Sequence, residues 1–379
     1  MRSFVPVGIF ENGLRSGGLH LQMRWVKPYQ YSILFFGPVR QMMRRTLRLR
    51  QLSNRRALAP ICVLGFLYWS LWASHASYAG LVDTVRVDWA YYNPISLVLK
   101  NKHWLQDDLA SSGIKVEWVQ SLGSNKALEF LRGKSIDFGS TAGAAAFIGR
   151  ANGNPIKAIY VYSAPEWTAL VMGPKSGITR IEDLRGKRVA VARGTDPHIF
   201  LLRSLASAGL SESDIQVVPL QHPDGKVALE RGQVDAWAGL DPYMAQLEIE
   251  KGFKLFFRRP DWNSFGLLNV REAFAAEHPD ITECVLRAYE KARLWCLGHS
   301  DEARNILQSE AQLSPAVAEK VWERTNLKDS RLGSAQRQVI VESANALKTN
   351  GIIDPNTNVE EIVTELLDSS FADRIAIAK

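Results

Sequence analysis

Small polar residues follow four of the predicted strands, in the segments 122–125, 137–143, 193–198 and 238–242, at the points where helices are expected to begin. Ser140 and Thr141 follow a predicted strand over 136–139, and Gly194 and Thr195 follow one over 188–192. The first N–H groups of a helix have no partner in the helix and carry a partial positive charge, so they can bind an oxyanion. In an α/β sheet such junctions meet at the carboxyl ends of the strands. The pattern predicts a site for a small oxyanion.

The same residues have a simpler interpretation as helix caps. Ser, Thr, Asp and Pro are common at helix starts in α/β proteins of every function. Asp196 and Asp241 fit this role best, because a free carboxylate at either position would repel an anion. For Ser140, Thr141 and Thr195 both interpretations remain open.

Aromatic side chains gather near the same junctions: Tyr91, Tyr92, Tyr162, Trp167, Trp237 and Tyr243. Such rings cover an apolar part of a ligand, stack on a cation or pack in the core. Glu166, next to Trp167, either pairs with a ligand amine or is solvated. We take Tyr91, Tyr92, Glu166, Trp167 and Trp237 as candidate ligand-binding residues.

Motifs for catalysis and for metal binding are missing from the sequence. It contains no G-x-S-x-G, H-E-x-x-H, P-loop or G-x-G-x-x-G motif. The seven histidines are scattered, and His198 and His222 fit a surface or structural role. Cys284 and Cys296 fall in one predicted helix, about 18 Å apart along its axis, which is too far for a disulfide. We predict no catalytic residue, no cofactor and no metal.

Short β-rich runs alternate with helical runs up to residue 270, and the pattern is helical from residue 271 onward. This alternation predicts an α/β fold with mainly parallel sheets flanked by helices and a C-terminal helical tail.

Two interruptions divide the α/β region, at Gly173-Pro174 and at Arg259-Pro260. We predict lobe I over 83–173 plus 264–379, and lobe II over 174–263. A cleft between two lobes joined by two crossings is a preferred ligand site and allows hinge closure.

The positive charge of the chain is concentrated at its front. The 379 residues carry a net charge of +7, but residues 1–79 hold 11 of the 46 Lys and Arg and one acid, Glu11. The remainder is slightly acidic, so we expect no nucleic-acid partner. A basic run, an apolar stretch over 61–73 and small residues up to Ala79 are typical of a secretory signal peptide. We expect export by the Sec or twin-arginine route and cleavage after Ala79, or else after Ala76.

Residues 1–41 fit no targeting pattern, and a start at Met42 or Met43 would give a more ordinary signal peptide. The alternative is an uncleaved membrane anchor, but the apolar stretch is short against the roughly 20 residues that a spanning helix needs.

Five segments resemble the periplasmic substrate-binding proteins of nitrate, taurine and sulfonate ABC importers, and most of all the aliphatic sulfonate-binding proteins. The segments are 135–141, 182–190, 193–195, 208–210 and 232–237, the last followed by Asp241-Pro242. The resemblance spans about 85–279 and implies a two-lobe, type II-like binding-protein fold. It implies a periplasmic, monomeric transport protein that takes a sulfonate-like solute to an inner-membrane permease.

The resemblance also assigns residues to the site. It implies that Ser140 and Thr141 from lobe I, and Gly194 and Thr195 from lobe II, bind the anion. Tyr91, Tyr92 and Asn93 would occupy the loop after the first strand. The loops over 163–167 and 193–197 depart from the family pattern, which leaves the organic part of the ligand open.

Two other functions compete with solute binding. One is an enzyme on the same fold, such as a thiamine-pyrimidine precursor synthase, and the other is the effector-sensing half of a regulator. The signal segment favours a binding protein over both, and the sequence contains no Cys-rich motif or helix-turn-helix segment. The ligand remains open among an alkanesulfonate, taurine, nitrate, a sulfate ester and a pyrimidine.

Overall fold

The computed structural model describes residues 82–377. The predicted signal peptide, with its apolar stretch over 61–73 and its cleavage sites after Ala76 and Ala79, lies outside the described residues. Within residues 82–377, no helix is long and apolar enough to cross a membrane.

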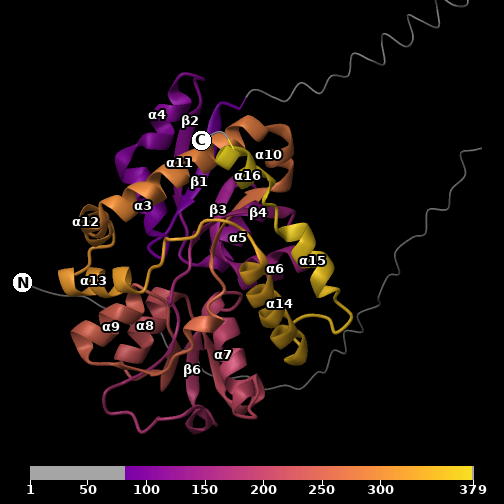
Figure 1. The fold of residues 1–379 in the computed structure, drawn as a ribbon. Coiled ribbons are helices and arrows are strands. Elements are labelled where there is room, and N and C mark those ends of the chain that lie inside the picture. Colours follow the sequence, from indigo (N-terminus) through magenta and orange to yellow (C-terminus); the bar gives the residue numbers. More distant parts are fainter. Residues whose placement is uncertain (1–81, 378–379) are drawn as a thin grey trace, which may run out of the picture. The chain divides into compact units, whose positions relative to one another are not determined.

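A five-stranded sheet forms the centre of the first lobe (Figure 1). Its order is β2-β1-β3-β10-β4. The strands are β1 (Thr84–Trp89), β2 (Lys115–Gln120), β3 (Phe138–Ala142), β4 (Ile156–Ser163) and β10 (Gly266–Arg271). β1 is parallel to β2 and β3, whereas β10 is antiparallel to β3 and β4. The carboxyl ends of β1, β2 and β3 therefore lie at the same end of the strands, on one side of the lobe.

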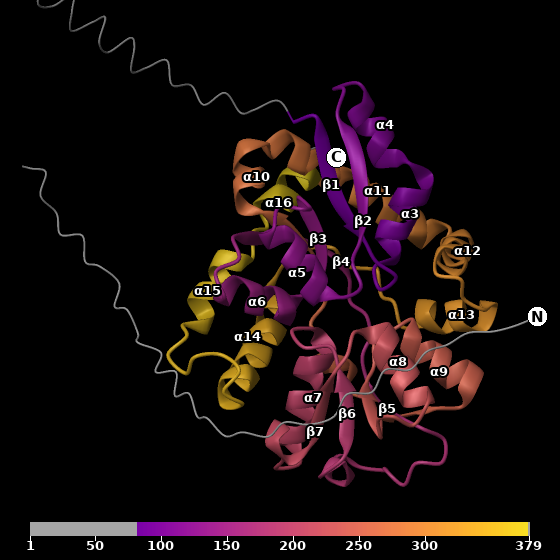
Figure 2. The ribbon, with the colours of Figure 1, turned by 180° about the vertical axis from the view of Figure 1, so that it is seen from behind.

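Helices from both ends of the described chain pack around this sheet (Figures 1 and 2). They are α3 (Pro94–Lys102), α4 (Trp104–Ala110), α5 (Ser124–Arg132), α6 (Gly143–Ala151), α10 (Glu272–Glu277), α11 (Pro279–Gly298), α12 (Ser300–Glu310), α13 (Pro315–Glu323), α14 (Ser334–Thr349), α15 (Val359–Leu366) and α16 (Ser370–Ile377). α11 buries Val285, Tyr289 and Ala292 on the face that the sequence periodicity predicts. It contains both Cys284 and Cys296 as free thiols, as predicted.

A second five-stranded sheet forms the other lobe, in the order β7-β6-β8-β5-β9. Its elements are β5 (Leu170–Met172), η2 (Ile181–Leu184), β6 (Arg188–Val191), α7 (Asp196–Ser207), η3 (Glu212–Asp214), β7 (Gln216–Pro219), α8 (His222–Glu230), β8 (Ala236–Ala238), α9 (Tyr243–Lys251), β9 (Lys254–Phe257) and η4 (Pro260–Trp262). β6 is parallel to β7 and β8, while β5 is antiparallel to β8 and β9. The predicted α/β fold with a C-terminal helical tail is confirmed, and both sheets are mixed.

Two segments, 164–169 and 258–265, connect the sheets. The sequence analysis placed the end of the first lobe at residue 173. In the structure β5 pairs with strands of the second sheet, so the first crossing ends before Leu170. Gly173-Pro174 follows a strand of the second lobe and does not mark the change of lobe.

The C-terminal tail touches both lobes. α13 packs against α9, and α14 packs against α7 (Figure 1). The chain after α13 runs beside the first crossing, where the N–H of Ala164 donates to the carbonyl of Asn326 and that of Glu166 to the carbonyl of Arg324, both at 2.8 Å. The tail is therefore a third link between the lobes.

Candidate functional site

Three helices, α5, α7 and α8, begin around one small cavity between the lobes (Figure 2 shows the three helices). Its wall contains Ser124, the first residue of α5, Thr195, the N-cap of α7, and His222, the first residue of α8. Tyr92, Trp167, Asp196, Pro197 and Leu240 complete the lining. The volume is about 10 Å³, room for no more than a single water molecule. We call this the interlobe cavity.

Two further cavities of similar size adjoin the interlobe cavity and share some of its lining. Tyr91 and Tyr92 line both, with Tyr243 in one, and with Pro165 and Trp167 in the other. The ring of Tyr92 makes an edge-on contact with that of Trp167, with centroids 6.0 Å apart. The structure therefore brings together three of the aromatic candidates, Tyr91, Tyr92 and Trp167, between the lobes.

Asp88, in β1, organises the polar groups on the first lobe's side. Its buried carboxylate accepts hydrogen bonds from the Ser121 hydroxyl at 2.6 Å and from the N–H and hydroxyl of Ser140, both at 2.8 Å. The Tyr92 hydroxyl donates to the Ser140 carbonyl at 3.0 Å, and the Asn93 amide donates to the Ser140 hydroxyl at 2.7 Å. Burial raises the pKa of Asp88 to about 6, although the hydrogen bonds oppose the shift. Asp88, Ser121, Ser140, Tyr92 and Asn93 thus form one hydrogen-bonded cluster.

Ser140 and Thr141 face opposite sides of β3, because successive strand residues alternate. Ser140 is held by Asp88 and Asn93, while the Thr141 hydroxyl accepts a hydrogen bond from the Asn269 amide at 2.8 Å. Both residues are fully buried, and neither lines the interlobe cavity. The structure does not bring the two hydroxyls together. Asn93, which bonds to Ser140, does not line the cavity either.

Thr195 lines the interlobe cavity on the second lobe's side, and Gly194, which precedes it, does not. The Thr195 hydroxyl donates to the carbonyl of Ala192 at 2.6 Å. Gly194 has a φ of +75°, a conformation that favours glycine. It faces α5, since a β-carbon at this position would lie 3.8 Å from the β-carbon of Asn125. The distance is an ordinary van der Waals contact, so it is the positive φ, and not the space, that favours glycine at this turn.

Several buried polar atoms around the second wall have no hydrogen-bond partner within residues 82–377. Both ring nitrogens of His222 belong to this group, as do Oε1 of Gln221 and, facing them from α5, Oδ1 of Asn125. His222 is 0% exposed, and burial lowers its pKa to about 3, which keeps the ring neutral. An unpaired buried polar group costs roughly 1–3 kcal/mol. Such groups are rare in folded proteins, and water or a ligand can supply the missing partners.

The sequence analysis gave His222 a surface or structural role, whereas the structure places it in the lining of the interlobe cavity. The available signal was its position next to Pro223, at the start of a predicted helix. Asp88 and Ser121 were missed as well, whereas Ser124 belongs to a junction that the sequence had indicated. Each is a polar residue at the end of a strand or the start of a helix, the feature that drew attention to Ser140.

Asp196 is hydrogen bonded to residues of both crossings. Its carboxylate accepts hydrogen bonds from the Trp167 indole at 2.8 Å, and from the N–H of Ser264 at 3.0 Å as well as the Ser264 hydroxyl. Asn263 accepts from the N–H groups of Trp167 and Thr168, both at 3.1 Å. Burial raises the pKa of Asp196. The prediction that Asp196 caps its own helix was wrong, because its carboxylate bonds to the crossings instead.

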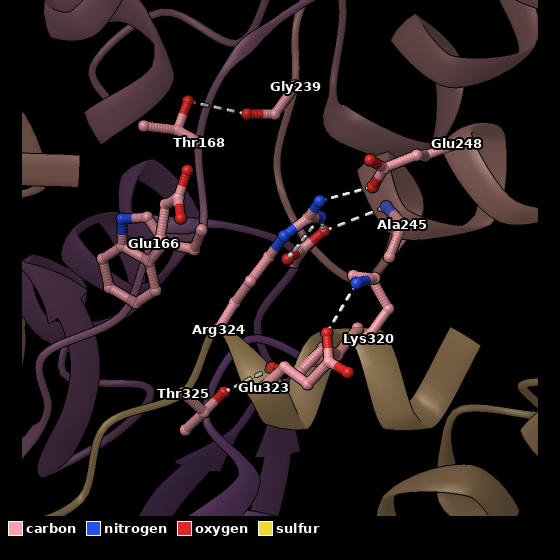
Figure 3. Close-up of polar contacts among 12 residues, drawn as sticks. Glu166, Thr168, Gly239, Ala245, Glu248, Lys320, Glu323, Arg324 and Thr325 are labelled. Atoms are coloured by element: carbon pink, nitrogen blue, oxygen red, sulfur yellow. Dashed lines mark hydrogen bonds and ion pairs between the residues drawn. The ribbon is translucent and has the colours of Figure 1, made fainter. Parts of the chain in front are cut away.

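Arg324, which follows α13, extends its guanidinium toward α9 (Figure 3). It lies 3.4 Å from both carboxylate oxygens of Asp241 and forms an ion pair with Glu248. Only 6% of the Arg324 side chain and 4% of the Asp241 side chain are exposed. Asp241 accepts from the N–H of Ala245 at 2.9 Å, in keeping with its predicted role as a helix cap. Burial raises the pKa of Asp241 to about 6 against the opposing effect of Arg324.

Two other predicted site residues point elsewhere. Glu166 forms a bidentate ion pair with Arg258 on the second crossing, with contacts of 2.7 and 2.8 Å. Trp237 is fully buried in β8, where it packs so closely on α8 that a β-carbon on Gly225 would lie 2.6 Å from the indole nitrogen. Neither residue lines the interlobe cavity.

A much larger cavity, of about 950 Å³, opens around the loop from Gly173 to Ile178 in the second lobe. It shares no lining residue with the interlobe cavity, and its lining mixes Lys175, Asp183 and Lys187. It is not surrounded by helix starts. Within residues 82–377, no three His, Cys, Asp or Glu side chains are arranged to hold a metal ion. We therefore place the candidate site at the interlobe cavity.

Comparisons with known proteins agree with this architecture. The family model described as NMT1/THI5 like matches residues 100–303, more than half of the chain. A protein of Bacillus subtilis (strain 168) named for binding aliphatic sulfonates is 29% identical over 270 residues, which cover 70% of this chain and 81% of that protein. Its counterpart in Escherichia coli (strain K12) is 32% identical over 200 residues, covering 52% of this chain and 62% of the relative.

The fold is also that of solved binding proteins. The alkanesulfonate-binding protein of Xanthomonas axonopodis pv. citri, solved bound to MOPS, aligns with a TM-score of 0.69 and 21% identity, over 76% of this chain and 99% of that one. The resemblance found in the sequence is confirmed. The chain belongs to the NMT1/THI5-like family and has the fold of its periplasmic sulfonate-binding proteins.

Proposed function

We propose that the protein is the solute-binding component of an ABC importer, and that it captures an aliphatic sulfonate and delivers it to an inner-membrane permease. Relatives named for binding aliphatic sulfonates support the ligand class. The proposal includes export to the periplasm, action as a monomer and binding without catalysis. The lining of the interlobe cavity supports a binding role, because it contains no cysteine and its one carboxylate is hydrogen bonded to the crossings.

The observation that carries the proposal is the meeting of three helix starts, those of α5, α7 and α8, around the fully buried His222, whose ring nitrogens have no partner among residues 82–377. A sulfonate has three oxygens that only accept hydrogen bonds. First-turn N–H groups are donors with a partial positive charge, so several helix starts can surround such a head group.

In this proposal the sulfonate head lies among Ser124, Thr195 and His222, and Gly194 forms the turn that leads into α7. The organic tail lies along Tyr91, Tyr92 and Trp167. Ser140 and Asn93 position Tyr92 from behind. Thr141, Glu166 and Trp237 are assigned to packing and ion pairing.

The interlobe cavity is too small for an organic sulfonate, with a volume of about 10 Å³. The lobes must therefore separate to admit the ligand, and the crossings over 164–169 and 258–265 are where the backbone would turn. Closure then requires contacts from the ligand to both lobes.

Isothermal titration with 1-butanesulfonate, taurine, nitrate and sulfate tests the ligand class. We expect 1-butanesulfonate to bind at least about tenfold more tightly than the inorganic anions, a difference of about 1.4 kcal/mol. The aromatic rings can pack on the butyl chain of 1-butanesulfonate, whereas nitrate and sulfate have no apolar part. Equal affinity for all four, or no affinity for either sulfonate, would contradict the proposal.

A variant of Gly123, the residue before α5, tests the position of the site. A β-carbon there would lie 2.9 Å from Oδ1 of Asn125 and 3.2 Å from the His222 ring. Gly123→Ala should weaken binding by about tenfold, because the added methyl keeps the lobes apart. Gly298→Ala is the matched control, since a β-carbon there would meet nothing within 4 Å. Equal affinities in the two variants would remove the site from the interlobe cavity.

A further inference from the structure

His222 lies at the first position of α8 and lines the interlobe cavity. The side chain is fully buried, and neither Nδ1 nor Nε2 has a hydrogen-bond partner in the part of the chain that the structure describes. One edge of the ring faces α5, since a β-carbon on Gly123 would lie 3.2 Å from both Cδ2 and Nε2. The imidazole therefore lies between the two lobes, next to the first residues of α5 and α8.

Two titratable groups share the interlobe cavity with His222. Tyr92, in the loop after β1, lines the cavity. Burial raises its pKa well above 10, so its hydroxyl is neutral. Asp196 enters from α7, and its carboxylate accepts hydrogen bonds from Trp167 and Ser264. An anion that enters this cavity meets the negative charge of Asp196 unless a positive charge compensates it.

The other elements around α8 bring charges that are paired or near solvent. Asp224, in α8 itself, is exposed, and Lys126 in α5 pairs with Glu129. Tyr243 in α9 is neutral, because burial raises its pKa to about 12. The strands beneath α8 bring Arg188 at the beginning of β6, where it is paired with Asp235.

We propose that His222 binds the anionic head of the ligand through its ring, and that the ring takes up a proton from solvent when the ligand binds. The inference rests on the proposed function and deepens it, because it names a residue that selects for an anion and couples its capture to pH.

The hydrogen-bonding capacity of the imidazole supports this proposal. A neutral ring has one donor and one acceptor nitrogen, whereas a sulfonate offers acceptors alone. A protonated ring offers two donors and a positive charge, which also offsets the carboxylate of Asp196. Without an anion, burial lowers the pKa of His222 to about 3 and the ring is neutral. A sulfonate in contact with the ring reverses that preference, because an opposite charge at this range favours the charged form.

Titration calorimetry with 1-butanesulfonate, whose own charge is constant near neutral pH, tests the proton uptake. Measurements at about pH 7.5 in two buffers of different ionisation enthalpy give the number of protons bound. We expect uptake of up to about one proton, and an affinity that rises by up to about tenfold for each pH unit once the pH falls below the pKa of the ring in the complex, until the free ring itself is protonated. His222→Gln should bind more weakly, take up no proton and lose the pH dependence. His299→Gln, which changes an exposed histidine beyond the cavity, should behave as the wild type.

Three results would overturn the inference. Wild-type binding without uptake, or with proton release, contradicts it while leaving the proposed function intact. Uptake that persists in His222→Gln assigns the proton to another group, such as Asp196. Failure of the wild type to bind any sulfonate contradicts the proposed function as well, and that outcome is distinct because it precedes any variant. The wild-type proton count needs no variant, and His222→Asn repeats the test if the glutamine variant does not fold.

Discussion

Each side of the interlobe cavity has a fully buried polar side chain, Asp88 on the first lobe and His222 on the second, and the two are paired differently. On the first lobe, Asp88 accepts three hydrogen bonds, and Tyr92 is bonded to the carbonyl of Ser140. On the second lobe, His222 is buried to the same degree, yet neither ring nitrogen has a partner within the described residues.

This difference distinguishes residues that support the fold from residues that are available to contact a ligand. A paired buried group stabilises one arrangement of its neighbours, whereas an unpaired one destabilises the fold unless something else supplies the partner. The first wall therefore has the character of a rigid support, and the second has the character of a surface that completes its hydrogen bonds with a ligand. The hydroxyls with the most partners, such as that of Ser140, are the least available to an anion.

The largest expected effect comes from removing Arg324, the buried cation that joins the end of α13 to α9 and the residues before it. Arg324→Met leaves Asp241 and Glu248 without their buried cation, and removing one partner of a buried ion pair typically costs about 3–5 kcal/mol. Urea unfolding measures the loss. Lys320→Met, on α13, removes only the exposed pair with Glu323 and should change the free energy of unfolding by less than about 0.5 kcal/mol. Equal effects would show that Arg324 does not hold the lobes together.

The next variant removes the centre of the paired wall. Asp88→Ala leaves the hydroxyls of Ser121 and Ser140, and one N–H, without their acceptor. We expect the free energy of unfolding to fall by about 3 kcal/mol, as several buried donors lose a partner at once. Asp83→Ala, at an exposed position just before β1, is the control. A loss confined to ligand affinity would instead make Asp88 a ligand contact.

The buried acids also predict how stability depends on pH. Burial raises the pKa of Asp88 and of Asp241 to about 6, from about 3.9 in an unfolded chain. Between these values the folded protein binds more protons than the unfolded chain. Their contribution to stability is therefore greatest below about pH 4 and is lost as the pH rises through about 6, at up to roughly 1.4 kcal/mol per pH unit for each group. Urea unfolding at a series of pH values measures this slope, and Asp88→Asn should flatten it. An unchanged slope in that variant would contradict the account.

The unpaired wall should respond in the opposite direction. His222→Leu replaces two unpartnered nitrogens with apolar atoms, so we expect the free energy of unfolding to rise by about 1 kcal/mol. Affinity for 1-butanesulfonate should fall at least about tenfold, since the head group loses a donor. Thermal melts and calorimetry on the same preparation measure both. A less stable variant with unchanged affinity would mean that His222 is part of the scaffold.

The sequence predicted those features that depend on local periodicity. The apolar face of α11 and the alternation of strands and helices were correctly identified, because both repeat with the period of their own element. The boundary of the first lobe at residue 173 rested on Gly173-Pro174. Those residues follow β5, whose place in the second sheet is decided by pairing with β8 and β9 far along the chain.

The site was harder to predict, because it depends on which side chains meet across the lobes. Ser140 and Thr141 are adjacent in sequence but face opposite sides of β3, a consequence of strand alternation that the cap-like pattern concealed. His222 and Ser124 are about a hundred residues apart and line one cavity. No spacing rule connects them, since their proximity follows from how the lobes pack.

A crystal structure of the protein with 1-butanesulfonate tests the central claim most directly, that the unpaired wall binds the ligand and the paired wall supports it. We predict a sulfonate oxygen about 3 Å from a ring nitrogen of His222, with the hydrogen bonds of Asp88 to Ser121 and Ser140 unchanged. A sulfonate bound to the hydroxyls of Ser140 and Thr141, or in the cavity around Gly173 to Ile178, would contradict it.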